Sequence, residues 1–193
     1  LTQRGNIAMF QGRIQDALEY FRAAGDLHRA AGEEGRALAD EVSVAQTLVY
    51  AGRATEAREL LDGILARTSR APSPSLLSWS HYIVGEAFTD ADVERALAAY
   101  AAAIAHASEA DCRLFETLAR GSSVALACRS GAPAATLDQF DELFAQQDQV
   151  GNELVELWLL RFLVVLLERL DAADDATVLA GALLTVQDRY PSF

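Results

Sequence analysis

The sequence contains no lysine, so all of its basic side chains are arginines. It has 16 of these against 28 Asp and Glu residues, which leaves a formal net charge of −12 at pH 7. Nucleic acids bind mainly to basic side chains that displace counterions, and an anionic membrane surface also attracts clusters of basic residues. The composition therefore argues against both partners, and we expect no direct nucleic-acid binding and no membrane association.

Cysteine and histidine are also scarce. Cys112 and Cys128 stand sixteen positions apart, which on one continuous helix is roughly 24 Å and too far for a disulfide bond. We expect two reduced, buried cysteines, as is usual in a cytoplasmic protein. The three histidines, His28, His81 and His106, show neither the mutual spacing nor the distance from a cysteine that is typical of metal ligands. The sequence therefore predicts no metal site.

Long hydrophobic runs and nucleotide-binding motifs are missing. The most apolar stretch, residues 157–167, contains Arg161 and is far shorter than the ~20 residues that span a bilayer, so it predicts a buried helix. No secretory signal and no glycine-rich phosphate loop is present. No nucleophile–base or acid–base pair stands out, so we expect a protein without cofactor or catalytic activity. The chain starts at Leu1 rather than Met, and we expect it to be a fragment of a larger multidomain protein.

What the sequence does have is an internal repeat. Residues 10–21 read FQGRIQDALEYF, and residues 50–61 read YAGRATEARELL. Small side chains recur every 39 or 40 residues, at Ala17, Ala57, Ala96, Thr136 and Ala176. A large side chain follows four positions later in the first four units, at Phe21, Leu61, Tyr100 and Phe140. A Gly or Asp precedes the small residue by five positions in four of the units, at Gly12, Gly52, Gly131 and Asp171.

This pattern predicts paired helices. Positions i and i+4 lie on one helical face, where the small residue admits a neighbouring helix and the large residue fills the space beside it. The Gly or Asp permits a tight turn before that helix. Apolar-periodic runs precede the turns at residues 1–11, 35–51, 75–88, 111–130 and 152–170. The sequence therefore predicts an all-α fold, an α-solenoid of about five antiparallel helix hairpins with a period of about 40 residues.

An Ala followed four positions later by an aromatic residue, with a glycine turn ahead of the Ala, resembles the tetratricopeptide (TPR) repeat. The period of this chain exceeds the roughly 34 residues of that family, so each helix is longer. With these longer helices, the chain is similar to the solenoids at the C-terminal end of bacterial signal-transduction ATPases and of LuxR- or SARP-type transcriptional regulators. The best local match is residues 149–183, with Gly151-Asn152, Trp158 and the stretch from Val178 to Ala182. The resemblance implies a single, right-handed TPR-like solenoid domain over residues 1–193.

The resemblance also implies a function. We expect a non-catalytic module for protein–protein interaction or effector sensing within a bacterial transcriptional regulator or signalling ATPase, located in the cytoplasm. Its partners would be a protein or peptide, a small effector, or other domains of the parent chain. The alternative is a stand-alone TPR-like scaffold that mediates assembly or self-association. Stacked helix pairs form extended concave surfaces, which suit either role.

In TPR-like solenoids the first helices of the units line the concave groove, which indicates where a partner would bind. The candidate groove residues are Gln46, Tyr50, Trp79, Tyr82, Glu86, Arg129, Trp158 and Arg161. Packing between units is the alternative role for Trp79 and Tyr82. The absence of lysine argues against the carboxylate clamp with which some TPR domains grip acidic peptide tails. The residues expected to pack the repeats are Gly12, Ala17, Phe21, Gly52, Ala57, Leu61, Ala96, Tyr100, Gly131, Phe140 and Ala176.

Overall fold

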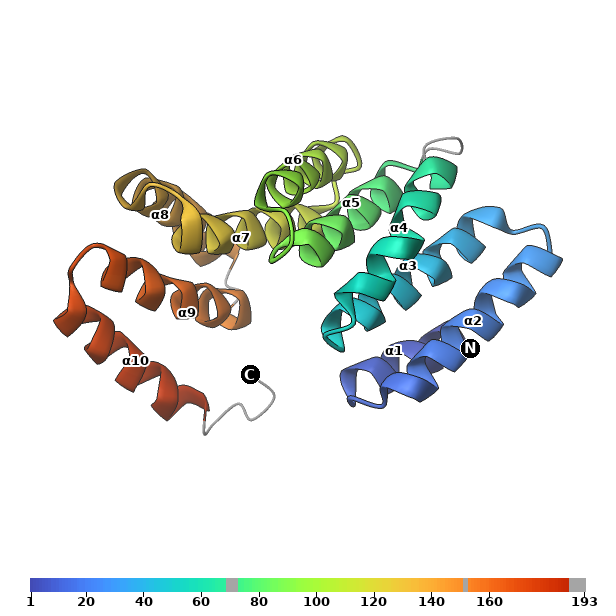
Figure 1. Cartoon of the computed structure of the whole chain (residues 1–193), viewed down its shortest axis with the longest axis horizontal. Helices are drawn as coiled ribbons and strands as arrows, with labels where there is room; N and C mark the ends of the chain where they lie inside the picture. The colour runs from blue at the N-terminus through green and yellow to red at the C-terminus, as the bar shows by residue number, and fades with distance from the viewer. Residues whose placement is uncertain (69–72, 151–152, 188–193) are drawn as a thin grey trace. The chain divides into compact units, whose positions relative to one another are not determined.

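The computed structural model describes residues 1–68, 73–150 and 153–187, and within those ranges it is built from helices and contains no strand (Figure 1). The helices are α1 (Thr2–Phe10), α2 (Ile14–Ala30), α3 (Glu34–Tyr50), α4 (Ala54–Thr68), α5 (Pro74–Phe88), α6 (Val93–Glu109), α7 (Arg113–Ser130), α8 (Pro133–Val150), α9 (Glu153–Arg169) and α10 (Ala173–Gln187). The prediction of an all-α fold is confirmed for the described residues. The five apolar-periodic runs coincide with α1, α3, α5, α7 and α9 to within two residues at each end.

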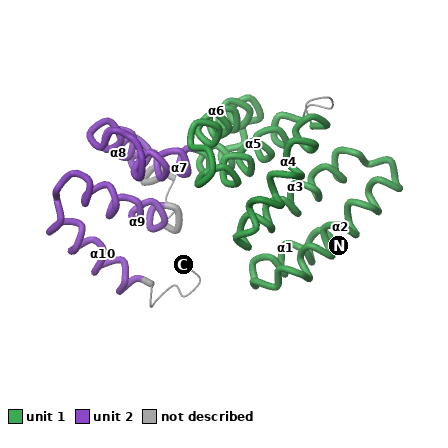
Figure 2. Tube along the Cα trace, in the orientation of Figure 1, with its two compact units in different colours: residues 1–119 green, residues 120–193 purple. Residues whose placement is uncertain are grey.

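The chain forms two compact units, residues 1–119 (unit 1) and residues 120–193 (unit 2) (Figure 2). In unit 1, each helix from α1 to α5 packs against the next one along the chain, and α3 also contacts α5. In unit 2, α8 packs on α9, and α9 packs on α10. The handedness, the repeat period and the single domain stay predictions.

The turns between helices use left-handed backbone at the positions where the sequence places Gly or Asp. Gly12 and Gly52 have φ angles of +71° and +73°, and Gly32 has +76°. Asp171 adopts the same region with φ 59°, which Asp tolerates better than most residues with a side chain. Gly131 differs, because it lies outside the left-handed region and is required by space. A Cβ there would lie 2.9 Å from the carbonyl oxygen of Ala127.

Two glycines in the first helices make room for aromatic rings of the second helices in unit 1. A Cβ at Gly5 would lie 2.6 Å from the ring of Phe21, and a Cβ at Gly85 would overlap the ring of Tyr100. Both rings are buried. The small repeat residues Ala17, Ala57 and Ala96 are completely buried, so helices approach closely at these points.

The core of unit 2 consists of larger side chains. Buried residues of α7, α8 and α9 form one cluster: Val124, Cys128, Phe140, Leu143, Leu159 and Leu166. Gly121 leaves space for the ring of Trp158, which a Cβ would overlap. Arg169, at the end of α9, donates to the carbonyl oxygens of Cys128 and Gly131 at 2.7 and 2.6 Å. The carbonyl of Cys128 is in the last turn of α7 and that of Gly131 directly follows the helix, where carbonyls have no partner within the helix, so Arg169 satisfies them.

Candidate functional site

A groove lies between α2 and α4 in unit 1. We call it the α2–α4 groove; its volume is about 560 Å³. Because α3 packs against both α2 and α4, residues of α3 contribute to its lining. The apolar part includes the buried side chains of Phe21, Val44 and Ile64. Leu60, on the α4 wall, is 42% exposed.

Charged side chains of both signs line the same groove. They are three arginines and three carboxylates: Arg22, Arg29, Arg67, Asp26, Glu41 and Glu59. The lining therefore carries no excess of either charge. A surface that recognises a polyanion such as nucleic acid needs a stripe of uncompensated basic residues instead.

Glu41, on α3, connects the two walls of the groove. Its carboxylate accepts hydrogen bonds from Arg29 Nη2 at 2.8 Å and from Arg67 Nη1 at 2.7 Å. Arg29 also donates to Asp26 at 2.8 Å, and Arg67 to Glu34 at 2.9 Å. The hydrogen bonds to Glu41 are the largest cause of the raised pKa of both arginines. This network ties α2 and α4 to α3 and sets the distance between the walls.

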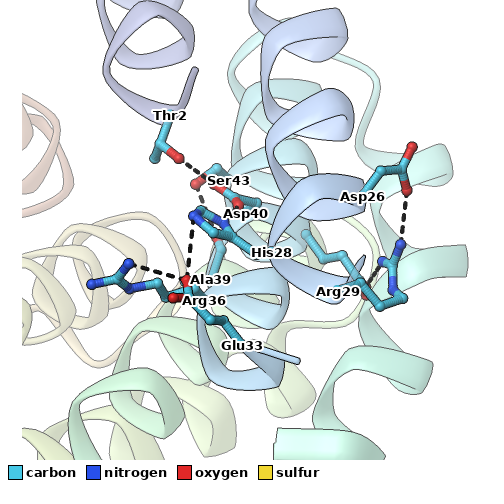
Figure 3. Close-up of polar contacts among 10 residues, drawn as sticks. Thr2, Asp26, His28, Arg29, Glu33, Arg36, Ala39, Asp40 and Ser43 are labelled. Atoms are coloured by element: carbon cyan, nitrogen blue, oxygen red, sulfur yellow. Dashed lines mark hydrogen bonds and ion pairs between the residues drawn. The ribbon is translucent and has the colours of Figure 1, made fainter. Parts of the chain in front are cut away.

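A second polar cluster lies next to the groove and involves the preceding residue, Asp40 (Figure 3). Its carboxylate is 2% exposed, contacts His28 Nδ1 at 2.6 Å and accepts a hydrogen bond from Thr2 Oγ1 at 2.8 Å. A carboxylate that orients an imidazole is common in catalytic sites, but there the hydroxyl binds the imidazole. Here the Thr2 hydroxyl donates to Asp40 instead of His28. The arrangement joins α1, α2 and α3 and gives the buried carboxylate of Asp40 its hydrogen-bond partners. Within the described residues, no buried side-chain nitrogen or oxygen lacks such a partner.

The structure separates the candidate groove residues of unit 1 into small groups. Gln46 Nε2 donates to the hydroxyl of Tyr50 at 3.1 Å, and Tyr50 is half exposed. Trp79 is partly buried and stacks on Phe115 with 5.8 Å between ring centroids. Stacking of this kind is consistent with packing between helices, the role that the sequence left open for Trp79.

Tyr82 and Glu86 meet at a residue that was expected to pack the repeats. The ring of Tyr82 lies 6.3 Å from the ring of Tyr100, and the hydroxyl of Tyr100 donates to Glu86 Oε1 at 2.8 Å. Tyr82 is only 4% exposed. The structure therefore places Tyr82 in the core of unit 1, where it packs between α5 and α6.

The other three candidates lie in unit 2. Arg129 is exposed in the last turn of α7. Trp158 packs edge-on against Phe162 with 5.3 Å between centroids. Arg161 lines an apolar cavity of about 270 Å³ between α9 and α10, together with Leu157, Val164 and Leu183. We call this the α9–α10 cavity. Gly151 and Asn152, which carry part of the family resemblance, lie outside the described residues.

The α2–α4 groove was not predicted from the sequence, because the resemblance to TPR repeats indicated a binding surface on the first helices of the hairpins. The groove is instead walled by two second helices. One signal was available: Gly25 and Gly63 stand inside these helices, where glycine costs about 1 kcal/mol relative to alanine. Neither is at a turn. A Cβ at Gly63 would meet no atom within 4 Å, so packing does not require glycine there.

The part of the chain that the structure describes contains neither a metal-binding cluster nor a membrane-spanning helix. No group of three or more His, Cys, Asp and Glu side chains there is placed to hold a metal ion. None of the described helices is both long enough and apolar enough to pass through a membrane. A scan against models of protein families and a search of curated proteins found no match to this chain.

Proposed function

We propose that this chain is a non-catalytic interaction module, a right-handed TPR-like α-solenoid that binds a protein segment or a small effector in the α2–α4 groove. The observation that carries the proposal is the groove itself. Its lining combines buried apolar side chains with three arginines and three carboxylates. Its volume of about 560 Å³ falls in the range of ligand sites, roughly 300–1,000 Å³.

The groove is also held in shape before any ligand arrives. Arg29 from one wall and Arg67 from the other wall both bind Glu41 of α3. A binding surface that is already ordered loses less conformational entropy on association. The parent protein that we propose, a bacterial transcriptional regulator or signalling ATPase, rests on the resemblance of residues 149–183 and of the repeat.

The experiment compares the protein with a variant in which the groove is filled. Gly63→Trp places a large side chain where a Cβ has no neighbour within 4 Å, so it occupies the groove without displacing the core. Gly63→Ala is the matched control, because it adds one methyl group and favours the helix. Both are used in a selection from a displayed peptide library and in a thermal-shift screen of small effectors.

We expect to find ligands that bind the unsubstituted protein and the Gly63→Ala variant at least tenfold more tightly than they bind the Gly63→Trp variant. Circular dichroism and melting curves establish that all three proteins are folded. The proposal fails if no peptide or small molecule binds, or if every ligand found binds the Gly63→Trp variant as tightly as the unsubstituted protein.

A second candidate function is a scaffold that self-associates, and the surface of α10 favours it. Val178 and Leu184 of α10 are 74% and 65% exposed, and Leu184 lines the apolar α9–α10 cavity. If this surface binds a second copy, sedimentation at micromolar concentration will show a dimer that Leu184→Glu converts to a monomer. If the unsubstituted protein is a monomer, this candidate is ruled out.

A further inference from the structure

The charged residues of the α2–α4 groove fall into two groups at its two ends. At one end, Arg29 and Arg67 are already bound by Glu41. At the other end, Arg22 of α2 and Glu59 of α4 make no hydrogen bond or ion pair within the described residues. The first end therefore holds the groove together, whereas the second end presents one positive and one negative group that are available to a ligand.

Arg22 and Glu59 belong to opposite walls of the groove. The charge of Arg22 also acts across the groove on α4, since it contributes to the lowered pKa of Glu56 after the larger effect of the hydrogen bond from Arg53. A ligand at this end therefore meets a guanidinium on one side and a carboxylate on the other. Charge complementarity favours a ligand that carries both an acidic and a basic group.

Between these charged residues, the groove is lined by apolar side chains. Leu60 is partly exposed, and Ile64 and Val44 lie beneath the surface. Gly63 has no side chain to narrow the space between α2 and α4, and a Cβ there would meet no atom within 4 Å. An aliphatic side chain of a ligand placed here would bury Leu60 and gain about 25 cal/mol for each Å² of apolar surface removed from water.

We propose that the α2–α4 groove binds a peptide segment of a partner protein in which an aliphatic side chain stands between one acidic and one basic side chain. The acidic side chain pairs with Arg22, the basic side chain pairs with Glu59, and the aliphatic side chain fills the space over Gly63. This inference rests on the proposed function and specifies its ligand. A peptide suits the site because the groove is open and flanked by two helices of 17 and 15 residues.

The test begins with a phage-displayed library of random twelve-residue peptides. Peptides that bind the unsubstituted protein are selected, and those that also bind the Gly63→Trp variant are removed. We expect the enriched peptides to share an acidic, an aliphatic and a basic residue in close succession. One enriched peptide is then labelled and titrated by fluorescence anisotropy. We expect Arg22→Glu and Glu59→Arg each to weaken its binding at least tenfold.

Matched controls separate a local contact from the overall charge of the protein. Arg4→Glu and Glu19→Arg make the same changes in charge at exposed residues that do not line the groove, and we expect less than a twofold effect. The double variant Arg22→Glu/Glu59→Arg should bind a peptide in which the acidic and basic residues are exchanged. Such a recovery depends on direct pairing and does not follow from a change in stability.

The outcomes distinguish this inference from the proposed function. Two results overturn the inference but not the proposed binding module. In one, peptides require an open groove but lack the acidic, aliphatic and basic residues in succession. In the other, neither Arg22→Glu nor Glu59→Arg weakens their binding. Binding of free zwitterionic amino acids, with no peptide enriched, also overturns it, because the ligand is then a small molecule. The absence of any groove-dependent ligand overturns both proposals.

Discussion

Unit 1 and unit 2 accommodate aromatic rings in the same way but place them differently. In unit 1, Gly85 of α5 faces Tyr100 of α6, the second helix of the same hairpin. In unit 2, Gly121 of α7 faces Trp158 of α9, the first helix of the following hairpin. Tyr100 is 1% exposed, while Trp158 is only partly buried. The same small-to-large contact thus fixes a hairpin in unit 1 and joins successive hairpins in unit 2.

The two units also differ in how densely their helices are surrounded. In unit 1, α3 contacts α2, α4 and α5, and the completely buried positions include many alanines. In unit 2, α10 packs mainly on α9 and leaves Val178 and Leu184 exposed. The comparison predicts that equivalent substitutions cost more in unit 1.

The largest expected effect comes from a buried charge at equivalent repeat positions. Ala57→Glu should lower the free energy of unfolding by about 3–5 kcal/mol, because α4 lies between α3 and α5 and the carboxylate has no partner. Ala176→Glu should cost on the order of 1 kcal/mol, since α10 packs mainly on α9. Urea unfolding measures both, and hydrogen exchange locates the loss. Equal losses would contradict the comparison.

A methyl group added beside each aromatic ring is the next most severe change. Gly85→Ala should cost roughly 1–3 kcal/mol, because the ring of Tyr100 is enclosed. Gly121→Ala should cost less, because the partly buried ring of Trp158 has room to move. Gly35→Ala and Gly181→Ala are the controls, since a Cβ at either position meets nothing within 4 Å. Thermal melts of the four variants test the order.

Arginines that bind carbonyls at helix ends give a smaller difference between the units, and here the larger loss of stability is expected in unit 2. Arg169→Met should cost about 1.5–3 kcal/mol, because it removes charged hydrogen bonds to the carbonyls of Cys128 and Gly131. Arg58 of unit 1 donates to one carbonyl, that of Ala87, at 2.9 Å. Arg58→Met should therefore cost only about 1 kcal/mol. Urea unfolding of the two variants would refute this expectation if Arg58→Met proved the more damaging.

The smallest expected effect is a dependence on pH that belongs to unit 1, which contains all three histidines. His81 stacks on His106 at 5.6 Å, and burial, followed by the charge of His106, lowers the pKa of His81 below 6.5. The folded state therefore binds this proton less readily than the unfolded state. Stability contributed by neutral His81 is complete above pH 6.5 and decreases as the pH falls from 6.5 toward the folded pKa.

Hydrogen exchange at pH 7.5 and pH 5.5 measures this dependence. Amides of α5 and α6 should lose protection at the lower pH, and His81→Phe, which keeps the ring, should reduce that loss. Amides of α9 serve as the internal reference, because unit 2 contains no histidine. A pH response unchanged by His81→Phe would show that other groups cause it.

Local features of the chain were predictable in detail. The ends of α3, α5 and α9 follow from apolar periodicity and from turn residues within a few positions, and the structure agrees to within two residues. The left-handed turns at Gly12 and Gly52 were predictable for the same reason. The sequence also predicted a turn at Gly131, but not the reason for glycine there, which is the closeness of Thr136 and of the carbonyl of Ala127 in the folded turn.

The candidate site was less predictable, because it depends on contacts between helices. Glu41 binds Arg29, twelve positions away, and Arg67, twenty-six positions away, and no local pattern links them. Tyr82 shares a helical face with Glu86, yet it is buried against Tyr100 of the next helix.

The sequence by itself determined where helices begin and end and which small residues lie inside, because period and turn chemistry act over a few neighbouring residues. Only the tertiary structure decided that Arg22 and Glu59 come to opposite walls of one groove while Arg29 and Arg67 are bound by Glu41. That choice depends on how three helices pack, and packing is set by the shapes of surfaces distant in the chain.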